Sequence, residues 1–256
     1  MILFEIKNQV ATLTLNRPER YHSFIREMAL DLQEKLEICK NDNNIRAIVI
    51  TGTGKAFCAG QDLGEATDPN GPELQKIVNE HYNPIIRQIR NIEKPIIAAV
   101  NGVAAGAGAS IALCCDIVIA KESAVFIQAF SKIGLVPDSG ATFFLPRLIG
   151  FQKASALMMN ADPISAIEAE RLGMIYKIVE ESKFEDEIIS FSEKLAKMPT
   201  KGIGLTKKLL NQSINNSLEQ QLHEEEIAQT IAGKTHDYKE GVSAFLEKRK
   251  PNFKGN

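Results

Sequence analysis

Two glycine-flanked turns combine residue types that could stabilise a developing negative charge. They are Ala59-Gly60-Gln61 and Gly106-Ala107-Gly108, and each follows a run of strand-forming residues. The second turn also leads into an apolar segment predicted to be a helix, whose first N–H groups are unpaired and whose dipole is positive at that end. Two converging N–H groups can bind an oxygen that gains negative charge, and small residues let a carbonyl group approach closely. Spacing alone leaves open that both are only tight turns.

A single acid, Asp138, follows in the turn Pro137-Asp138-Ser139-Gly140, between apolar segments. An apolar environment raises the pKa of a carboxyl group and suits it to proton transfer. The competing interpretation is structural, because Asp is a favoured N-cap residue and a helix is predicted to begin near Ser139. If Asp138 is functional, the acid and the two turns could together stabilise a negative oxygen and move a proton beside it.

The sequence gives less support to nucleotide binding, zinc binding and a serine nucleophile. Neither turn matches a dinucleotide-binding fingerprint or a P-loop, which disfavours a nucleoside triphosphate enzyme. The histidines are scattered and the cysteines lack CxxC spacing, so we expect no zinc site and four reduced thiols. Ser110 and Ser139 have no histidine at a recognisable spacing, which disfavours a serine nucleophile activated by histidine.

The composition is typical of a soluble globular protein. Of the 256 residues, 44% are hydrophobic and 24% are charged, and 30 basic against 32 acidic residues give a formal charge of −2. This balance gives no global attraction to nucleic acid or to membranes, and no apolar run is long enough to cross a bilayer. The first residues carry Glu5 where a signal peptide would be apolar, so we expect a cytoplasmic protein.

Predicted strands and helices alternate over the first hundred residues. Alternating apolar residues over 2–15 predict a β-hairpin, and apolar residues at helical spacing predict a helix over 25–39. Apolar, β-branched runs at 45–51 and 96–100 predict buried strands. This order of elements predicts an α/β sheet with crossover helices.

Most of the other elements that the sequence predicts are helices. One is expected over 73–92, with a bend near Pro84. We divide the chain into a core that holds the site, residues 1–195, and a C-terminal helical region, residues 196–256, that covers the core or forms an assembly surface. The later helices are expected at about 185–197, 203–212, 217–232 and 237–249.

Five longer segments run collinearly along the chain: NRPER, KAFCAGQDL, AVNGVAAGAGASIALCCDIVIA, FSKIGLVPDSGATFFLPRLIG and EGVSAFLEKRKPNF. Through them the chain resembles the crotonase (enoyl-CoA hydratase/isomerase) superfamily over about residues 3–254. The resemblance implies an α/β fold with a spiral core of ββα units and a C-terminal helical trimerisation region, so we expect a homotrimer or a hexamer. It implies an acyl-CoA thioester as substrate, no separate cofactor or metal, and no nucleic-acid or membrane partner.

The resemblance also implies roles for individual residues. The oxyanion donors correspond to the main-chain N–H groups of Gln61 and Ala107, with Gly108 as the alternative if the register shifts by one residue. Asp138 corresponds to a working carboxylate of several isomerases in the superfamily. We therefore expect the N–H groups to stabilise a thioester enolate while Asp138 transfers a proton.

Two positions depart from the pattern of the hydratases. Where those enzymes place their catalytic glutamates, this chain has Ser110 and Phe130. Adding water to a double bond needs an acid and a base around the water, so hydratase activity is not expected. An aromatic ring at Phe130 would instead give the cavity an apolar wall suited to an aromatic acyl group.

Further residues are expected to contact the substrate or its coenzyme A. Lys248 could reach the phosphates from a neighbouring subunit, or it could belong to a solvated basic tail. Asp62 could instead shape its own loop, and whether Glu65 or His81 assists Asp138 stays open. The expected contact residues are Arg17, Arg20, Ala59, Gln61, Asp62, Leu63, Phe130 and Lys248.

Three functions are weighed. The segments AGQDL, NGVAAGAGA and AFSKIGLVPDSG most resemble isomerases of phenylacetate catabolism, which convert ring-1,2-epoxyphenylacetyl-CoA to oxepin-CoA. The alternative within the superfamily is a Δ3-Δ2-enoyl-CoA isomerase of fatty-acid oxidation that uses the same residues. A third possibility, from another class, is a non-catalytic CoA-ester-binding or RNA-associated scaffold. The missing glutamates favour the scaffold, whereas Asp138 and the two turns argue against it.

Overall fold

The computed structural model describes all 256 residues and has a six-stranded main sheet. Its strands are β1 (Ile2–Lys7), β2 (Val10–Leu15), β3 (Ala47–Gly52), β5 (Ile96–Val100), β7 (Ile117–Lys121) and β10 (Lys177–Val179). They lie in the order β1-β2-β3-β5-β7-β10, and only β1 and β2 pair antiparallel. The predicted α/β sheet with crossover connections is therefore confirmed.

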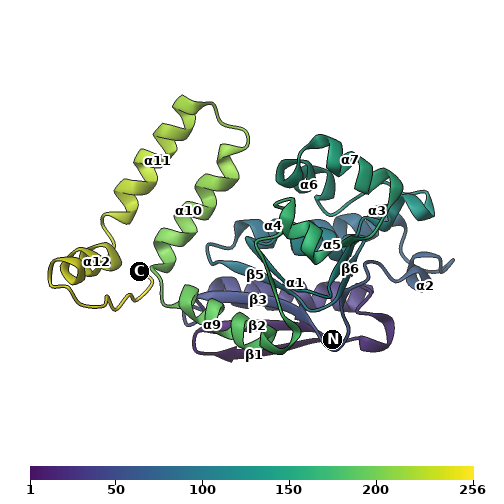
Figure 1. Cartoon of the computed structure of the whole chain (residues 1–256), viewed down its shortest axis with the longest axis horizontal. Coiled ribbons are helices and arrows are strands. Elements are labelled where there is room, and N and C mark those ends of the chain that lie inside the picture. Colours follow the sequence, from purple (N-terminus) through teal and green to yellow (C-terminus); the bar gives the residue numbers. More distant parts are fainter.

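The hairpin predicted over 2–15 consists of β1 and β2 (Figure 1). Asn8 and Gln9 join the two strands, with positive φ angles of 49° and 65°. A two-residue turn of this kind follows the right-handed twist of the strands, which explains why polar residues occupy it.

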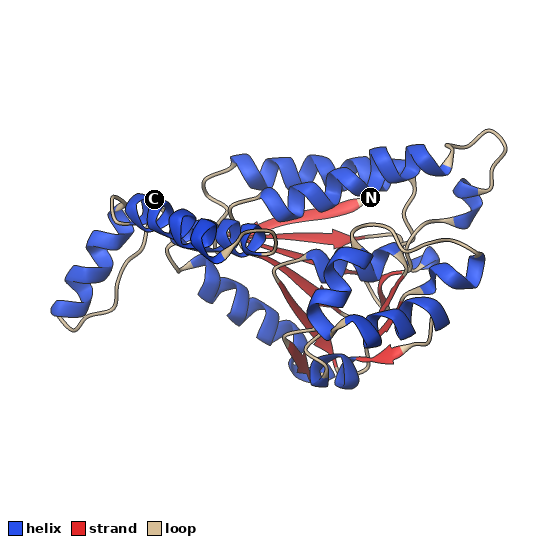
Figure 2. Ribbon diagram, turned by 90° about the horizontal axis from the view of Figure 1, so that it is seen from above, coloured by secondary structure: helices blue, strands red, loops and turns tan.

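Helices cover both faces of the main sheet (Figure 2). On β3, Ile48 and Ile50 belong to the large core, whereas Ala47 and Val49 belong to a smaller core. Successive side chains of a strand point to opposite faces, so this run is apolar on both. The helices of the core are α1 (Arg26–Asn41), α2 (Leu63–Ala66), α3 (Leu74–Lys76), α4 (Asn83–Asn91), α5 (Ala107–Cys114), α6 (Ala141–Ile149), α7 (Phe151–Asn160), α8 (Ala166–Arg171) and α9 (Phe184–Ala196).

The helix predicted over 73–92 is interrupted. Between α3 and α4 the residues Ile77–Tyr82 form a π-helical segment, and the N–H of Asn83 bonds the carbonyl oxygen of Val78, five residues earlier. Pro84 follows directly and has no N–H for the carbonyl of residue 80, so the regular ladder cannot continue through it. The predicted bend near Pro84 is thus a change of helix type just before the proline.

A second, smaller sheet positions the two glycine-flanked turns. Its strands are β4 (Ala56–Cys58), β6 (Val103–Ala105), β8 (Val125–Ile127) and β9 (Ile164–Ser165), in the order β4-β6-β8-β9. β4 and β6 are parallel neighbours, and each turn begins at the residue after its strand. The carboxyl ends of parallel strands meet at one edge of a sheet, so the two turns lie next to each other.

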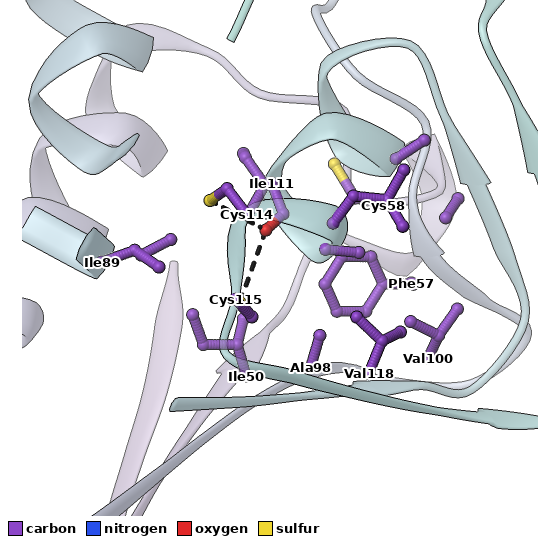
Figure 3. Packing of buried hydrophobic residues seen from close by; sticks show 14 of the residues in the cluster. Ile50, Phe57, Cys58, Ile89, Ala98, Val100, Ile111, Cys114, Cys115 and Val118 are labelled. Atoms are coloured by element: carbon purple, nitrogen blue, oxygen red, sulfur yellow. Dashed lines mark hydrogen bonds between the residues drawn. The ribbon is translucent and has the colours of Figure 1, made fainter. Parts of the chain in front are cut away.

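The large hydrophobic core contains cysteine thiols (Figure 3). Cys114 and Cys115 each bond the carbonyl oxygen of Ile111 within the buried end of α5. Cys39 and Cys58 are also free and buried, so all four cysteines are core residues in the reduced state.

The C-terminal helices extend to one side of the core (Figure 1). They are α10 (Thr200–Ser213), α11 (Leu218–Ala232) and α12 (His236–Leu246). Leu210, Leu218, Phe245 and Leu246 on these helices are between 62% and 81% exposed. The expected division after residue 195 falls at the end of α9. No helix combines the length and apolar composition needed to span a bilayer.

Candidate active site

The two glycine-flanked turns are in close contact. Gly60 has a φ angle of +89°, and a Cβ atom built on it would lie 3.3 Å from the nitrogen of Ala107 and 3.0 Å from the carbonyl oxygen of Ala105. A Cβ atom on Gly108 would collide with the carbonyl oxygen of Cys58. Only glycine allows both turns to approach in this way. The structure therefore places the turn that carries Gln61 against the turn that carries Ala107.

The N–H of Gln61 faces away from the strand-like contact that holds its loop. Phe24 donates to the carbonyl oxygen of Gly60 at 2.6 Å, and its own carbonyl oxygen accepts from Asp62 at 2.9 Å. Backbone groups of successive residues in an extended chain point in opposite directions, so the N–H of Gln61 points to the other side. None of the backbone hydrogen bonds in turns, loops and caps starts from it.

The N–H of Ala107 opens helix α5. Gly106 precedes it with φ 53° and ψ −128°, and Gly106 donates its own N–H to Ile127. Ala107 and Gly108 are the first two residues of the helix, so their N–H groups have no intrahelical acceptor. The positive end of the helix dipole adds to the attraction for an anionic oxygen. The site thus offers two unpaired donors on adjacent turns, as an oxyanion hole requires.

Asp138 does not cap a helix. The N-cap of α6 is Gly140, and no side chain caps this helix. The Asp138 carboxyl group instead accepts a hydrogen bond of 2.8 Å from the hydroxyl of Ser139, which is buried. Burial raises the pKa of Asp138, and the Ser139 hydrogen bond opposes this only in part. The carboxyl group therefore has the environment of a proton-transfer group.

The turn that carries Asp138 packs against α4. Gly140 has a φ angle of +76°, and a Cβ atom on it would lie 2.8 Å from the ring of Phe144 and 3.6 Å from Cγ2 of Ile86. Ile86 lies one helical turn after Tyr82 and on the same side of the helix. Tyr82 donates a hydrogen bond of 2.9 Å to the side-chain oxygen of Gln61. Sequence reasoning missed Tyr82, because no motif marks it.

The two positions expected to correspond to the hydratase glutamates carry no carboxylate and are buried. Ser110 bonds the carbonyl oxygen of Gly106, and Phe130 is only 7% exposed. Gln128 lies nearby in sequence with both amide atoms buried and without a partner. No group of three His, Cys, Asp or Glu side chains is arranged to hold a metal ion.

The NRPER loop is locked to the first turn by an ion pair. Arg17 contacts the carboxylate of Asp62 at 2.6 Å and also bonds Ser23, so its guanidinium is occupied internally. Asp62 accepts the N–H of Gly64 and caps α2. Burial alone would raise the pKa of Asp62, but the hydrogen bonds from Arg17 and Gly64 lower it. Asp62 thus shapes its loop, and a contact of Arg17 with coenzyme A stays a prediction.

The ring of His22 also holds the NRPER loop in place, through hydrogen bonds at both of its nitrogens. It is fully buried, its Nδ1 accepts the N–H of Arg17 at 2.9 Å, and its Nε2 lies 2.7 Å from the carbonyl oxygen of Thr53. The backbone N–H can only donate, so Nε2 carries the proton of a neutral ring. Burial lowers the pKa of His22, despite the opposing hydrogen bond to Thr53.

The remaining predicted contact residues are less closely grouped. Ala59 is half-buried beside Gly60, whereas Arg20 and Leu63 are exposed on their loops. Lys248 is exposed after α12, which lies on the opposite side of the molecule from α2 (Figure 1). A contact of Lys248 with a thioester bound at the turns would therefore have to come from another subunit.

Glu65 and His81 both contact Arg26, and neither forms a hydrogen bond with Asp138. Glu65 accepts from the side chain of Gln61 at 2.8 Å and from the N–H of Arg26 at 2.8 Å. The Nε2 of His81 lies 3.4 Å from the same arginine, and its Nδ1 has no partner. Whether either residue assists Asp138 in catalysis stays open.

Known proteins resemble the chain over its whole length. The profile of the enoyl-CoA hydratase/isomerase family matches residues 5–256. The chain is 47% identical over 257 residues to the 1,2-epoxyphenylacetyl-CoA isomerase of Escherichia coli (strain K12), over 99% of this chain and 98% of that protein. It is 41% identical over 254 residues to a protein of Rhodobacter capsulatus named "Probable enoyl-CoA hydratase", over 99% and 98% of the two chains. The crystal structure of an enoyl-CoA hydratase from Polaromonas sp. JS666 has a TM-score of 0.91 at 34% identity, over 98% of this chain and 99% of that one.

Proposed function

The chain belongs to the enoyl-CoA hydratase/isomerase family of the crotonase superfamily, and on that basis we propose that it is an isomerase of acyl-CoA thioesters. The observation that carries the proposal is the combination of Asp138, whose pKa is raised by burial, with non-carboxylate residues at Ser110 and Phe130. One proton-transfer acid suffices to move a hydrogen between two carbons of a bound substrate. Hydration would need further groups around a water molecule.

In the proposed mechanism the thioester carbonyl oxygen accepts hydrogen bonds from the N–H groups of Gln61 and Ala107. Charge that develops on this oxygen in the enolate strengthens both bonds, so they stabilise the transition state more than the ground state. Loss of one such donor typically costs about 3 kcal/mol. Asp138 removes a proton from one carbon and returns it to another, so the reaction has no net change in composition.

The proposed substrate is ring-1,2-epoxyphenylacetyl-CoA, with oxepin-CoA as product. Support comes from the Escherichia coli relative, whose name specifies an isomerase of 1,2-epoxyphenylacetyl-CoA. The buried ring of Phe130, in place of an acidic residue, is compatible with an aromatic-derived acyl group. In this reaction Asp138 would assist the opening of the epoxide.

A shift of the double bond in a 3-enoyl-CoA is the second candidate. It needs the same two N–H donors and a single acid, so the geometry that supports the first candidate supports it too. A scaffold without chemistry is disfavoured, because a partly buried acid with a raised pKa is costly to keep where it has no role.

We also propose that the working enzyme is a homotrimer or a hexamer. The exposed apolar side chains of α10, α11 and α12 favour an assembly surface there, and Val136 and Phe151 in the core region are 80% and 76% exposed as well. Burial of these side chains against other copies would remove apolar area from water.

The function is tested by comparing turnover of the ring-epoxide thioester with that of a 3-enoyl-CoA. We expect faster turnover of the epoxide, no hydration of a 2-enoyl-CoA, and loss of isomerisation in Asp138→Asn with CoA-ester binding retained in calorimetry. Full activity of Asp138→Asn would contradict the assignment. Binding without turnover of any thioester by the unmodified protein would favour the scaffold.

A further inference from the structure

The side chain of Gln61 is held at both ends of its amide. Its oxygen lies 2.9 Å from the hydroxyl of Tyr82, and its nitrogen lies 2.8 Å from a carboxylate oxygen of Glu65. The second carboxylate oxygen of Glu65 accepts the N–H of Arg26, the first residue of α1, at 2.8 Å. One chain of hydrogen bonds therefore joins the π-helical segment, the first turn, α2 and the start of α1.

The residue types determine which group donates and which accepts at each hydrogen bond of this chain. An ionised carboxylate only accepts hydrogen bonds, so the amide nitrogen of Gln61 must face Glu65. The amide oxygen then faces Tyr82, and an amide oxygen only accepts. Tyr82 is therefore the donor, and the orientation of the Gln61 amide is fixed by residues on both sides.

Tyr82 itself is rigidly placed. It is 1% exposed, and its ring packs against that of Phe24 with centroids 5.9 Å apart. Phe24 is also the residue whose backbone bonds Gly60 and Asp62, on either side of Gln61. Tyr82 and Phe24 thus hold the same residue from two directions, one through its side chain and one through its main chain.

Tyr82 also borders the part of the site that carries Asp138. Ile86, one turn further along the helix, packs against Gly140 in the Asp138 turn. Burial raises the pKa of Tyr82 well above its usual value, and the nearby negative groups, Asp138 and Glu65 among them, raise it further. The hydroxyl therefore keeps its proton and remains a hydrogen-bond donor to Gln61.

We propose that Tyr82 is a positioning residue that, through the side-chain amide of Gln61, aims the N–H of Gln61 at the thioester oxygen. The inference rests on the proposed role of that N–H in isomerisation. An oxyanion donor contributes most when charge is present on the oxygen, so a misdirected N–H slows the chemical step more than it weakens substrate binding. Glu65 serves the same purpose from the other end of the amide.

The first test is a double-mutant cycle. Tyr82→Phe removes only the hydroxyl, and Gln61→Met removes the amide but keeps the backbone N–H and the length of the side chain. We expect each to lower kcat by roughly 10- to 100-fold with KM within about threefold of the original, as for a disturbed oxyanion donor. The double variant should be no slower than the slower single variant, because both changes break the same chain.

The matched control is Tyr176→Phe, a tyrosine just before β10 that is 62% exposed. It should leave kcat and KM unchanged. Equal kcat for Tyr82→Phe and the original protein, or effects of Tyr82→Phe and Gln61→Met that multiply in the double variant, would overturn the inference. If Tyr82→Phe does not fold, Glu65→Gln tests the same chain, since a neutral amide no longer dictates the orientation of Gln61 and kcat should fall with little change in KM.

A spectroscopic test separates this inference from the proposed function. The carbonyl stretch of unreactive phenylacetyl-CoA, labelled with carbon-13 at the thioester carbon, should move to lower frequency on binding the original protein, because the N–H donors polarise the bond. The shift should be smaller in Tyr82→Phe. No binding or no shift in the original protein would contradict the proposed function itself. An equal shift in both proteins would overturn only the role of Tyr82.

Discussion

Gly60 touches the main chain at Ala107: a Cβ atom on Gly60 would lie 3.3 Å from the amide nitrogen of Ala107. The two residues belong to turns that follow parallel strands of the small sheet. A side chain at Gly60 would press against the turn that carries Ala107, the second proposed donor. The contact therefore links the backbone conformation of one residue to the geometry of the whole site.

Gly60→Ala should lower both stability and activity. The φ angle of +89° is unfavourable for alanine, and the new methyl group meets Ala105 and Ala107, so we expect a loss of about 1–3 kcal/mol in the free energy of unfolding. Displaced donors should lower kcat/KM by roughly 100-fold. Gly54→Ala is the control, because Gly54 also has a positive φ, +65°, but nothing within 4 Å of its Cβ position. Equal losses of activity in the two variants would show that the contact does not matter.

The activity of the unmodified enzyme should depend on the ionisation of Asp138. Burial raises its pKa, so the carboxylate needed to accept a proton is lost at a higher pH than for an ordinary aspartate. The acid limb of kcat/KM should therefore have its midpoint above about 4, the usual pKa of Asp. Measurement of kcat/KM from pH 4 to 8 checks this, and a profile that stays flat down to pH 4 would speak against it.

Asp138→Asn should make the fold more stable at neutral pH. A carboxyl group whose pKa is higher in the folded than in the unfolded state favours folding below the unfolded pKa, and this contribution is lost as pH rises through the folded pKa. The ionised group thus destabilises the protein at pH 7 to 8, and asparagine removes this cost. Urea unfolding should show a higher midpoint for the variant at pH 8 and a smaller difference near pH 4. A variant less stable than the original at pH 8 would contradict the sign.

Asp62→Ala should destabilise the first turn. The change removes the N-cap of α2 and leaves the partly buried Arg17 without its carboxylate, so we expect a loss of about 1–3 kcal/mol. Thermal unfolding followed by circular dichroism measures it. Asp162→Ala, at an exposed acid, is the control and should be close to the original protein. Identical midpoints for the two variants would show that the ion pair and cap contribute nothing.

Phe245→Glu should weaken the proposed assembly. Phe245 on α12 is 81% exposed, and a charge there would have to be buried if this surface joins other copies. Sedimentation velocity should show a trimer or hexamer for the original protein and a smaller species for the variant. Lys239→Glu changes charge at an exposed, already polar position of the same helix and should not alter the mass. A monomeric original protein would refute the proposal.

The sequence predicts most elements correctly where apolar periodicity decides. The hairpin, β3 and β5 were predicted because their apolar residues alternate or run continuously. Helix α10 begins at Thr200, and the prediction placed its start too late, at 203, because Gly202 and Gly204 lower the helix propensity of the first turn and hide it from the sequence pattern. Gly204 lets α10 pack closely against the main chain at Glu93, because a Cβ atom on it would lie 2.5 Å from the carbonyl oxygen of Glu93.

Contacts between distant residues are harder to predict. The two turns were recognisable from their composition, but the bond between Tyr82 and Gln61 joins residues 21 positions apart. It also depends on the π-helical segment, whose extra residue per turn rotates the following side chains away from where a regular helix would place them. The pairing of Arg17 with Asp62, across 45 positions, likewise depends on the folded loops.

Chemical labelling of the four buried thiols can measure local opening of the folded protein. Burial raises the pKa of Cys39 and of Cys58 to about 12, so neither forms an appreciable thiolate in the native state. Cys58 also accepts the N–H of Gly60 and donates to the carbonyl oxygen of His22, directly beneath the first turn. Its rate of labelling by a thiol reagent therefore measures how often the floor of the site separates from the loops above it, and a tightly bound thioester should slow that rate.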